Sequence, residues 1–184
     1  MKRVFVGIAV TDKLQRKVAQ WQADEALFAG REILLNNLHL TLIPPWDVEE
    51  NELDGIMEKI AFAVKGMKAF DLRYKKIVPG PMSKRPRLMW ANIQPDQKLS
   101  TIKGRLDNYF GVEEERKFLP HLTLLRFKKQ EKISREIKKY AKEIDWIDQV
   151  VEVTLFESFF SSQIEYVRLG SVGLEEAKVS ETGA

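Results

Sequence analysis

The sequence His-Leu-Thr-Leu occurs twice in this chain of 184 residues, at 39–42 and again at 121–124. The two copies contain both histidines of the chain. In a β-strand, the side chains of residues i and i+2 lie on the same face. Each histidine therefore lies beside the threonine of its own copy, while the leucines point to the opposite face. We expect two strands that each bury an apolar face and present one His-Thr pair.

The segments around the two copies follow one another in the same order. Alternating, β-rich stretches predict strands, and apolar residues at helical spacing predict helices. Around the first copy the pattern predicts a strand at 3–10, a helix at 14–21, a strand at 38–43, a helix at 53–64 and a strand at 69–78. Around the second copy it predicts a strand at 87–94, a helix at 99–109, a strand at 121–127, a helix at 133–144 and a strand at 150–160.

This order predicts an internal repeat of a strand–helix–strand–helix–strand unit. We expect one bilobal domain over 1–174, with the first repeat at about 1–79 and the second at about 86–160. A final strand at 164–171 has no counterpart in the repeat, and 175–184 is expected to be a flexible tail. The boundary is placed in 79–86, which is rich in proline, lysine and arginine.

Two histidines that meet in one cleft suit acid–base chemistry at phosphorus. Histidine titrates near neutrality, so one imidazole can accept a proton while the other donates one. The threonine hydroxyls can donate hydrogen bonds to phosphate oxygens. One such histidine alone is more often a buried structural residue, but two copies in register with a repeat favour a functional pair. Because zinc sites use three or four ligands, two histidines do not complete one, and we expect no metal and no cofactor.

The composition is that of a soluble globular protein, with 44% hydrophobic and 31% charged residues. No apolar run approaches the roughly 20 residues of a membrane helix, and the N-terminus does not resemble a signal peptide. The chain has no cysteine, which excludes disulfides and thiolate chemistry. We therefore expect a cytoplasmic protein. A net charge of +3 is compatible with a polyanionic ligand without requiring one.

Five stretches resemble the 2H phosphoesterase superfamily, and within it the RNA 2′,3′-cyclic phosphodiesterases, which are 2′-5′ RNA ligase-like proteins. They are Arg-Val-Phe-Val-Gly-Ile at 3–8, Asn-Leu-His-Leu-Thr-Leu at 37–42, Pro-Arg-Leu-Met-Trp-Ala at 86–91, Phe-Leu-Pro-His-Leu-Thr-Leu-Leu-Arg at 118–126, and the run 155–169. The resemblance implies an α+β fold of two pseudo-symmetric lobes with antiparallel sheets lining a central cleft. It also implies hydrolysis of a 2′,3′-cyclic phosphate to a 2′-phosphate.

The same resemblance assigns roles to individual residues. It implies that His39 is the proton donor to the leaving 3′ oxygen and that His121 is the proton acceptor that activates water. Thr41 and Thr123 would hold the phosphate, and Arg126 would add a cation. Strict alternation from His121 points Arg126 to the opposite face, so it reaches the cleft only through a bulge, a strand end or its long side chain.

Other residues near the motifs have two interpretations each. Phe5 is a candidate substrate-binding residue, because an aromatic ring can stack on a nucleobase; core packing is the alternative. For Trp46, packing is favoured. A basic patch at 84–87 either contacts RNA phosphates or is a solvated linker. After the first motif the sequence departs from the family with Ile-Pro-Pro-Trp at 43–46, and the two prolines are expected to end the strand.

The sequence therefore predicts a metal-independent RNA 2′,3′-cyclic phosphodiesterase that acts on RNA ends or small cyclic nucleotides. Two alternatives remain open. One is a 2′-5′ RNA ligase, in which a 5′-hydroxyl replaces water in the same in-line chemistry. The other is a non-catalytic module that binds RNA ends, although two intact motifs argue against it. We expect no membrane association and a monomer.

Overall fold

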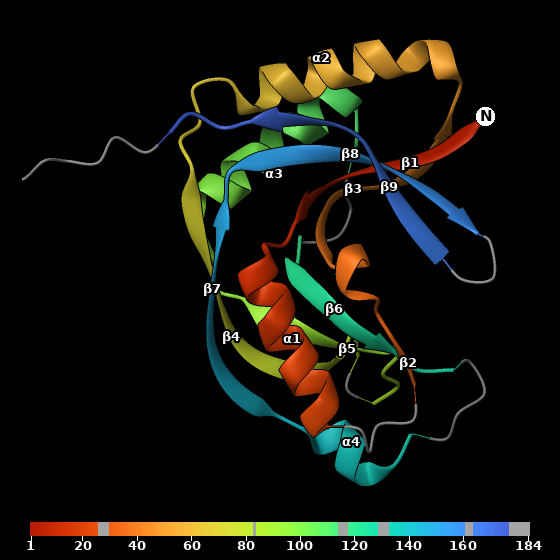
Figure 1. The fold of residues 1–184 in the computed structure, drawn as a ribbon, viewed down its shortest axis with the longest axis vertical. Coiled ribbons are helices and arrows are strands. Elements are labelled where there is room, and N and C mark those ends of the chain that lie inside the picture. The colour runs from red at the N-terminus through yellow and green to blue at the C-terminus, as the bar shows by residue number, and fades with distance from the viewer. Residues whose placement is uncertain (26–29, 83, 114–117, 129–132, 161–163, 177–184) are drawn as a thin grey trace, which may run out of the picture.

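The computed structural model describes residues 1–25, 30–82, 84–113, 118–128, 133–160 and 164–176 (Figure 1). The elements, in chain order, are β1 (Lys2–Ala9), α1 (Asp12–Asp24), β2 (Arg31–Glu32), η1 (Leu35–Asn37), β3 (His39–Val48), η2 (Glu50–Glu52), α2 (Leu53–Val64), β4 (Phe70–Gly80), β5 (Leu88–Ile93), α3 (Gln97–Phe110), β6 (His121–Arg126), α4 (Arg135–Lys139), β7 (Lys142–Val150), β8 (Glu152–Phe160) and β9 (Ile164–Gly173).

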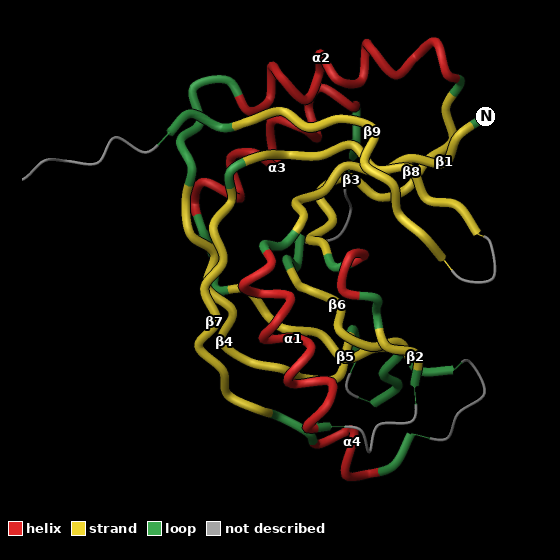
Figure 2. Tube along the Cα trace, viewed as in Figure 1, coloured by secondary structure: helices red, strands yellow, loops and turns green. Residues whose placement is uncertain are grey.

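The strands form two antiparallel sheets, one in each lobe (Figures 1 and 2). One sheet has the order β3-β1-β8-β9, and the other has the order β2-β6-β5-β4-β7. Helices α2 and α3 contact the first sheet, whereas α1 and α4 contact the second. The apolar sides of these helices and sheets form the core; α1, for example, buries Leu14, Val18 and Trp21. The α+β, two-lobed fold expected from the sequence is confirmed.

The two sheets repeat the same order of strands, since β3-β1-β8-β9 corresponds to β6-β5-β4-β7. Each sheet combines strands from both halves of the chain: β8 and β9 complete the sheet of β1 and β3, and β2 and β4 join the sheet of β5, β6 and β7. Thus β8 pairs with β1, and β4 pairs with β5. A lobe is therefore not the same as a sequence repeat, because each half completes the sheet of the other. The repeat boundaries at 79 and 86 stay a prediction.

The prediction of a helix over 133–144 is wrong for most of its length. Only Arg135–Lys139 is helical, with the Ser134 hydroxyl accepting a hydrogen bond from the backbone of Ile137. From Lys142 the chain forms β7, which pairs with β4. The isoleucines that suggested a helix are β-branched residues that also suit a strand, and pairing with β4 decides between the two. This strand takes the place in its sheet that β9 takes in the other, so the final strand does have a counterpart.

The expected end of the strand at Pro44 is also wrong, because β3 continues to Val48. The register to β1 jumps between the pairs Val4–Trp46 and Val6–Ile43, which leaves an extra residue in β3 at the prolines. Proline is tolerated at such bulges and on edge strands, and β3 forms one edge of its sheet.

The remaining boundaries differ by a few residues. The strand expected to end before Pro79 runs to Gly80. The backbone of Glu175 makes hydrogen bonds to the backbones of Met67 and Ala69. Residues 177–184 lie outside the described part of the chain, so the flexible tail over 175–184 stays a prediction. Gly111 ends α3 in a left-handed conformation with φ 63°. Within the described ranges, no helix has both the length and the apolar character needed to cross a membrane.

Candidate active site

The two histidines begin equivalent strands of the two sheets. His39 is the first residue of β3 and His121 is the first residue of β6, and these two strands contact each other between the lobes. The charges of His121 and Arg126 both lower the pKa of His39, and Arg126 also lowers the pKa of His121. The fold therefore brings His39, His121 and Arg126 into one electrostatic environment.

Both imidazoles are held in the same way by the backbone two residues earlier. Nδ1 of His39 lies 2.7 Å from the carbonyl oxygen of Asn37, and Nδ1 of His121 lies 2.7 Å from that of Leu119. A carbonyl oxygen only accepts hydrogen bonds, so Nδ1 carries the proton in both rings. Nε2 of each neutral ring is then unprotonated. In His39 it lies 3.1 Å from the hydroxyl oxygen of Thr41, the neighbour that strand alternation predicts.

His39 is enclosed by aromatic rings. The ring centroids of Phe5 and Tyr166 lie 4.7 Å and 5.0 Å from that of His39, and Phe156 stacks on Phe5 at 4.9 Å. This burial is the main reason that the pKa of His39 falls from 6.5 to about 4; the hydrogen bond to the Asn37 carbonyl opposes the shift. With this pKa, His39 is neutral at pH 7.

Phe5 packs inside the aromatic cluster around His39. Its side chain is only 1% exposed, because it is covered by His39, Phe156 and Tyr166. Phe5 therefore packs against His39 in this structure, and its role in substrate binding stays a prediction. Trp46 likewise packs edge-on against Phe110 at 5.4 Å, as favoured from the sequence.

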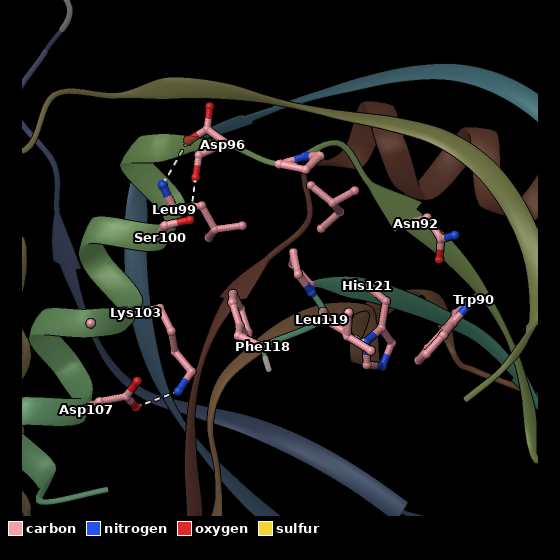
Figure 3. Close-up of a pocket in the computed structure, with 14 residues that line it drawn as sticks. Trp90, Asn92, Asp96, Leu99, Ser100, Lys103, Asp107, Phe118, Leu119 and His121 are labelled. Atoms are coloured by element: carbon pink, nitrogen blue, oxygen red, sulfur yellow. Dashed lines mark hydrogen bonds and ion pairs between the residues drawn. The ribbon is translucent and has the colours of Figure 1, made fainter. Parts of the chain in front are cut away.

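His121 lies against Trp90, with 4.3 Å between ring centroids, and a cavity of about 640 Å³ opens beside the pair (Figure 3). Phe118 and Leu119 line the cavity on the side of His121, and α3 closes the opposite wall. Burial lowers the pKa of His121 below 6.5, and the charge of Arg126 lowers it further. The buried Nε1 of Trp90 has no hydrogen-bond partner among the described residues. The second histidine thus adjoins a largely apolar cavity.

Arg126 lies on the His121 side of β6 because of a β-bulge. Met89 pairs with Leu125, but the next residue of β5, Trp90, pairs with Thr123. The extra residue, Leu124, resets the alternation, and both Leu124 and Leu125 are buried. A bulge was one of the three routes allowed by the sequence. The first motif has a similar bulge at residue 42, but Pro44 occupies the position equivalent to Arg126, so this cation is present on one side only.

Thr123 lies on the same strand as His121 and pairs in register with Trp90. Its side chain is partly exposed, as is that of Thr41. One histidine and one threonine from each sheet are therefore available to a ligand between the lobes. Among the residues that the structure describes, no group of three or more His, Asp or Glu side chains is arranged to hold a metal ion.

Sequence reasoning gave no role to Asn37. Its carbonyl orients His39, its amide donates a hydrogen bond of 2.8 Å to the carbonyl of Ile164, and its amide oxygen accepts one of 3.2 Å from the backbone of Tyr166. Asn37 thus holds β9 against the first motif and places the ring of Tyr166 beside His39. Leu119 lies two residues before His121, as Asn37 lies two residues before His39, and its carbonyl orients His121 in the same way.

The sequence model of the 2′-5′ RNA ligase superfamily matches residues 10–158. A curated relative from Thermotoga maritima, named RNA 2′,3′-cyclic phosphodiesterase, is 27% identical over 149 residues, which cover 73% of this chain and 77% of that protein. A relative of the same name from Methanocaldococcus jannaschii is 25% identical over 150 residues, covering 78% and 83%.

Solved structures show the same fold. The structure of Escherichia coli LigT complexed with 3′-AMP superposes with a TM-score of 0.76 at 23% identity, covering 94% of this chain and 98% of that chain. A further structure, described as a phosphoesterase, has a TM-score of 0.78 at 23% identity, covering 95% and 98%. These matches confirm the family resemblance and the fold predicted from the sequence.

Proposed function

Since this chain belongs to the 2′-5′ RNA ligase superfamily, we propose that it hydrolyses the 2′,3′-cyclic phosphate at an RNA end to a 2′-phosphate, without a metal, using His39 and His121 as acid and base. Its curated relatives are named for this activity. One observation carries the proposal. Each sheet contributes one strand with a His-Thr pair, and the charge of Arg126 acts on both histidines.

The proposed step is an in-line displacement at phosphorus. Nε2 of His121 accepts a proton from water while the water oxygen bonds to phosphorus. The bond between phosphorus and the 3′ oxygen breaks, and Nε2 of His39 gives its proton to that oxygen. The product keeps the phosphate on the 2′ oxygen. The next turnover begins after the proton on His121 has returned to His39 through solvent.

The remaining groups stabilise the charge that develops on the phosphate. The hydroxyls of Thr41 and Thr123 donate hydrogen bonds to the non-bridging oxygens, and the guanidinium of Arg126 lies beside them. Such donors act most strongly where water is excluded, and the rings around His39 provide that environment.

Binding of the substrate favours protonation of the acid, His39. With a pKa of about 4, His39 is almost entirely neutral at pH 7, and an acid needs its proton. A phosphate anion beside the ring favours the imidazolium form, so substrate binding raises the pKa of His39. Arg126 opposes this shift by its own positive charge. Proton uptake is therefore coupled to binding of the phosphate.

A second candidate function is 2′-5′ ligation, and the cavity beside His121 favours it. Its volume of about 640 Å³ lies in the range of small-molecule sites, and Phe118, Leu119 and Pro120 give it apolar walls. The cavity adjoins the histidine proposed as the base, where the entering group approaches. A nucleoside with a free 5′-hydroxyl in this cavity would present that hydroxyl to His121 in place of water.

The test is turnover of RNA with a 2′,3′-cyclic phosphate end and of 2′,3′-cyclic AMP, in excess chelator, with products identified by ³¹P NMR. We expect a 2′-phosphate. His39→Ala and His121→Ala should each lower kcat by at least about 10²-fold, the contribution typical of a general acid or base. Lys13→Ala on the exposed side of α1 is the control and should leave kcat unchanged.

The outcomes separate the candidates. Turnover that survives either histidine substitution contradicts the paired mechanism, and a 3′-phosphate product contradicts the assignment of His39 to the 3′ oxygen. A joined product in the presence of a 5′-hydroxyl oligonucleotide supports ligation. Tight binding of every cyclic-ended RNA without turnover supports the non-catalytic RNA-end-binding module.

A further inference from the structure

A strongly basic groove begins where the candidate active site ends. It has a volume of about 1080 Å³ and lies between the start of β5, the end of β6 and α4. Six cationic side chains line it, and no carboxylate does so among the lining residues that the structure describes. The six are Lys84, Arg85, Arg87, Arg126, Lys128 and Lys138.

Backbone hydrogen bonds build this groove from segments far apart in the sequence. The backbone N–H of Arg87 donates to the carbonyl of Gly80 at 2.8 Å, which closes the turn between β4 and β5. The carbonyl of Arg87 in turn accepts from the backbone N–H of Phe127 at 3.0 Å, which holds the end of β6 beside that turn. The cations are therefore carried by a hydrogen-bonded frame rather than by a free linker.

Two arginines of the groove differ from lysines elsewhere in the chain that form ion pairs. Lys2, Lys75 and Lys142 each form an ion pair, with nitrogen–oxygen distances of 2.8, 2.6 and 3.0 Å. By contrast, no ion pair within the described ranges involves the side chains of Arg85 or Arg87, and both are exposed. The chain as a whole is nearly balanced, with 30 basic and 27 acidic residues, so this groove is a local excess of positive charge.

Arg126 connects the groove to the histidines. It lines the groove on one side, and on the other it lines a small cavity with Asn37 and Tyr166, the residues that hold and cover His39. An RNA strand whose end lies at the histidines can therefore continue past Arg126 into the groove.

We propose that this groove binds the sugar–phosphate backbone of single-stranded RNA on the 5′ side of the reacting end, an inference that rests on the proposed function for the position of that end. A mononucleotide has a single phosphate, which the histidines, threonines and Arg126 already accommodate. Only a longer strand supplies further phosphates for groove cations such as Arg85 and Arg87. Their neutralisation releases counterions from the strand, so binding depends on salt. The groove makes an RNA oligomer a better substrate than a cyclic mononucleotide.

The test compares two substrates in two charge-matched variants. Lys84→Gln/Arg85→Gln/Arg87→Gln removes three cations of the groove and leaves Arg126 in place. Lys13→Gln/Arg16→Gln/Lys17→Gln removes three from α1 and is the control for net charge. Circular dichroism and thermal unfolding show that each variant is folded. The substrates are 2′,3′-cyclic AMP and an oligoadenylate with a 2′,3′-cyclic phosphate end.

For the native protein we expect a lower KM for the oligomer than for the mononucleotide. The groove variant should raise the KM for the oligomer at least about tenfold, with kcat and the mononucleotide KM unchanged. The slope of the logarithm of the association constant for the oligomer against the logarithm of the salt concentration should become shallower by about 2, the value for three phosphate contacts on a single strand. The control variant should leave the KM for the oligomer close to that of the native protein.

Equal KM values for the two substrates in the native protein, or a groove variant that behaves like the control, would overturn the inference. Fluorescence anisotropy with the labelled oligomer separates this failure from failure of the proposed function, because it needs no turnover. Groove-dependent binding without hydrolysis supports the groove and overturns the proposed activity. Hydrolysis of both substrates with groove-independent binding supports the activity and overturns the groove.

Discussion

Lowering the pH from 7 to 4 should destabilise this protein through His39. Burial among aromatic rings lowers the pKa of His39 from 6.5 to about 4 in the folded state. In the unfolded chain the imidazole is in water and takes up a proton near pH 6.5. Between these values the unfolded state binds more protons than the folded state. The stability that is present above pH 6.5 is therefore lost as the pH falls towards 4.

The size of this loss follows from the two pKa values. The difference between 6.5 and about 4 corresponds to about 3 kcal/mol at 25 °C, since each pH unit of difference is worth about 1.4 kcal/mol. Small domains have a total stability of about 5–15 kcal/mol, so protonation of this one ring should remove a large share of it. Burial of His121 acts in the same direction.

The assay is urea unfolding of the native protein and of His39→Gln at pH 7 and pH 4. Glutamine does not titrate in this range, and the other titratable groups are common to both proteins, so the comparison isolates His39. We expect the native protein to lose about 3 kcal/mol more than the variant between the two pH values. Because the chain has only two histidines, NMR titration of the imidazole signals checks the pKa directly.

Equal losses in the two proteins would refute the reasoning, because His39 would then titrate alike in the folded and unfolded states. An imidazole signal of His39 that titrates near 6.5 in the native protein would do the same. Either result would mean that the rings of Phe5 and Tyr166 do not keep water from His39. It would also contradict the proposal that His39 is protonated only when the substrate binds.

Four further predictions concern the same site. The kcat/KM for 2′,3′-cyclic AMP should rise as the pH falls from 8 towards 6, because His39 must carry a proton and its pKa is about 4; a kcat/KM that is independent of pH would contradict this. Thr41→Val keeps the shape but removes a donor, so kcat should fall by about 10²-fold while urea unfolding changes little. Phe5→Leu removes the ring that packs on His39 and Phe156, and should cost about 1–3 kcal/mol in urea unfolding; an unchanged midpoint would contradict the packing role. Gly7→Ala places a methyl group 2.7 Å from the carbonyl oxygen of Leu40, so β1 and β3 must move apart and the melting temperature should fall, by an amount equivalent to about 1–3 kcal/mol.

Much of the fold was predictable because strand and helix patterns are local. The alternation around His39 and His121 correctly predicted the strands β3 and β6, and apolar spacing correctly predicted α2 and α3. The prediction failed at 133–144, where isoleucines at helical spacing lie in a short helix and then in β7. Their spacing suits both structures, and pairing with β4, some 70 residues earlier in the chain, decides which one forms.

In the candidate site, too, some features follow from the local sequence and others only from tertiary contacts. The sequence alone determined that each histidine stands beside a threonine, because residues i and i+2 of a strand share a face whatever surrounds them. Only the tertiary structure decided that Phe5 is covered by Phe156 and Tyr166, and that a bulge at Leu124 turns Arg126 towards the histidines. It also decided that β4 joins the sheet of β5 and β6, and that β8 and β9 join the sheet of β1 and β3. Burial, bulges and strand exchange depend on partners distant in the chain, and local spacing carries no information about which partner a strand meets.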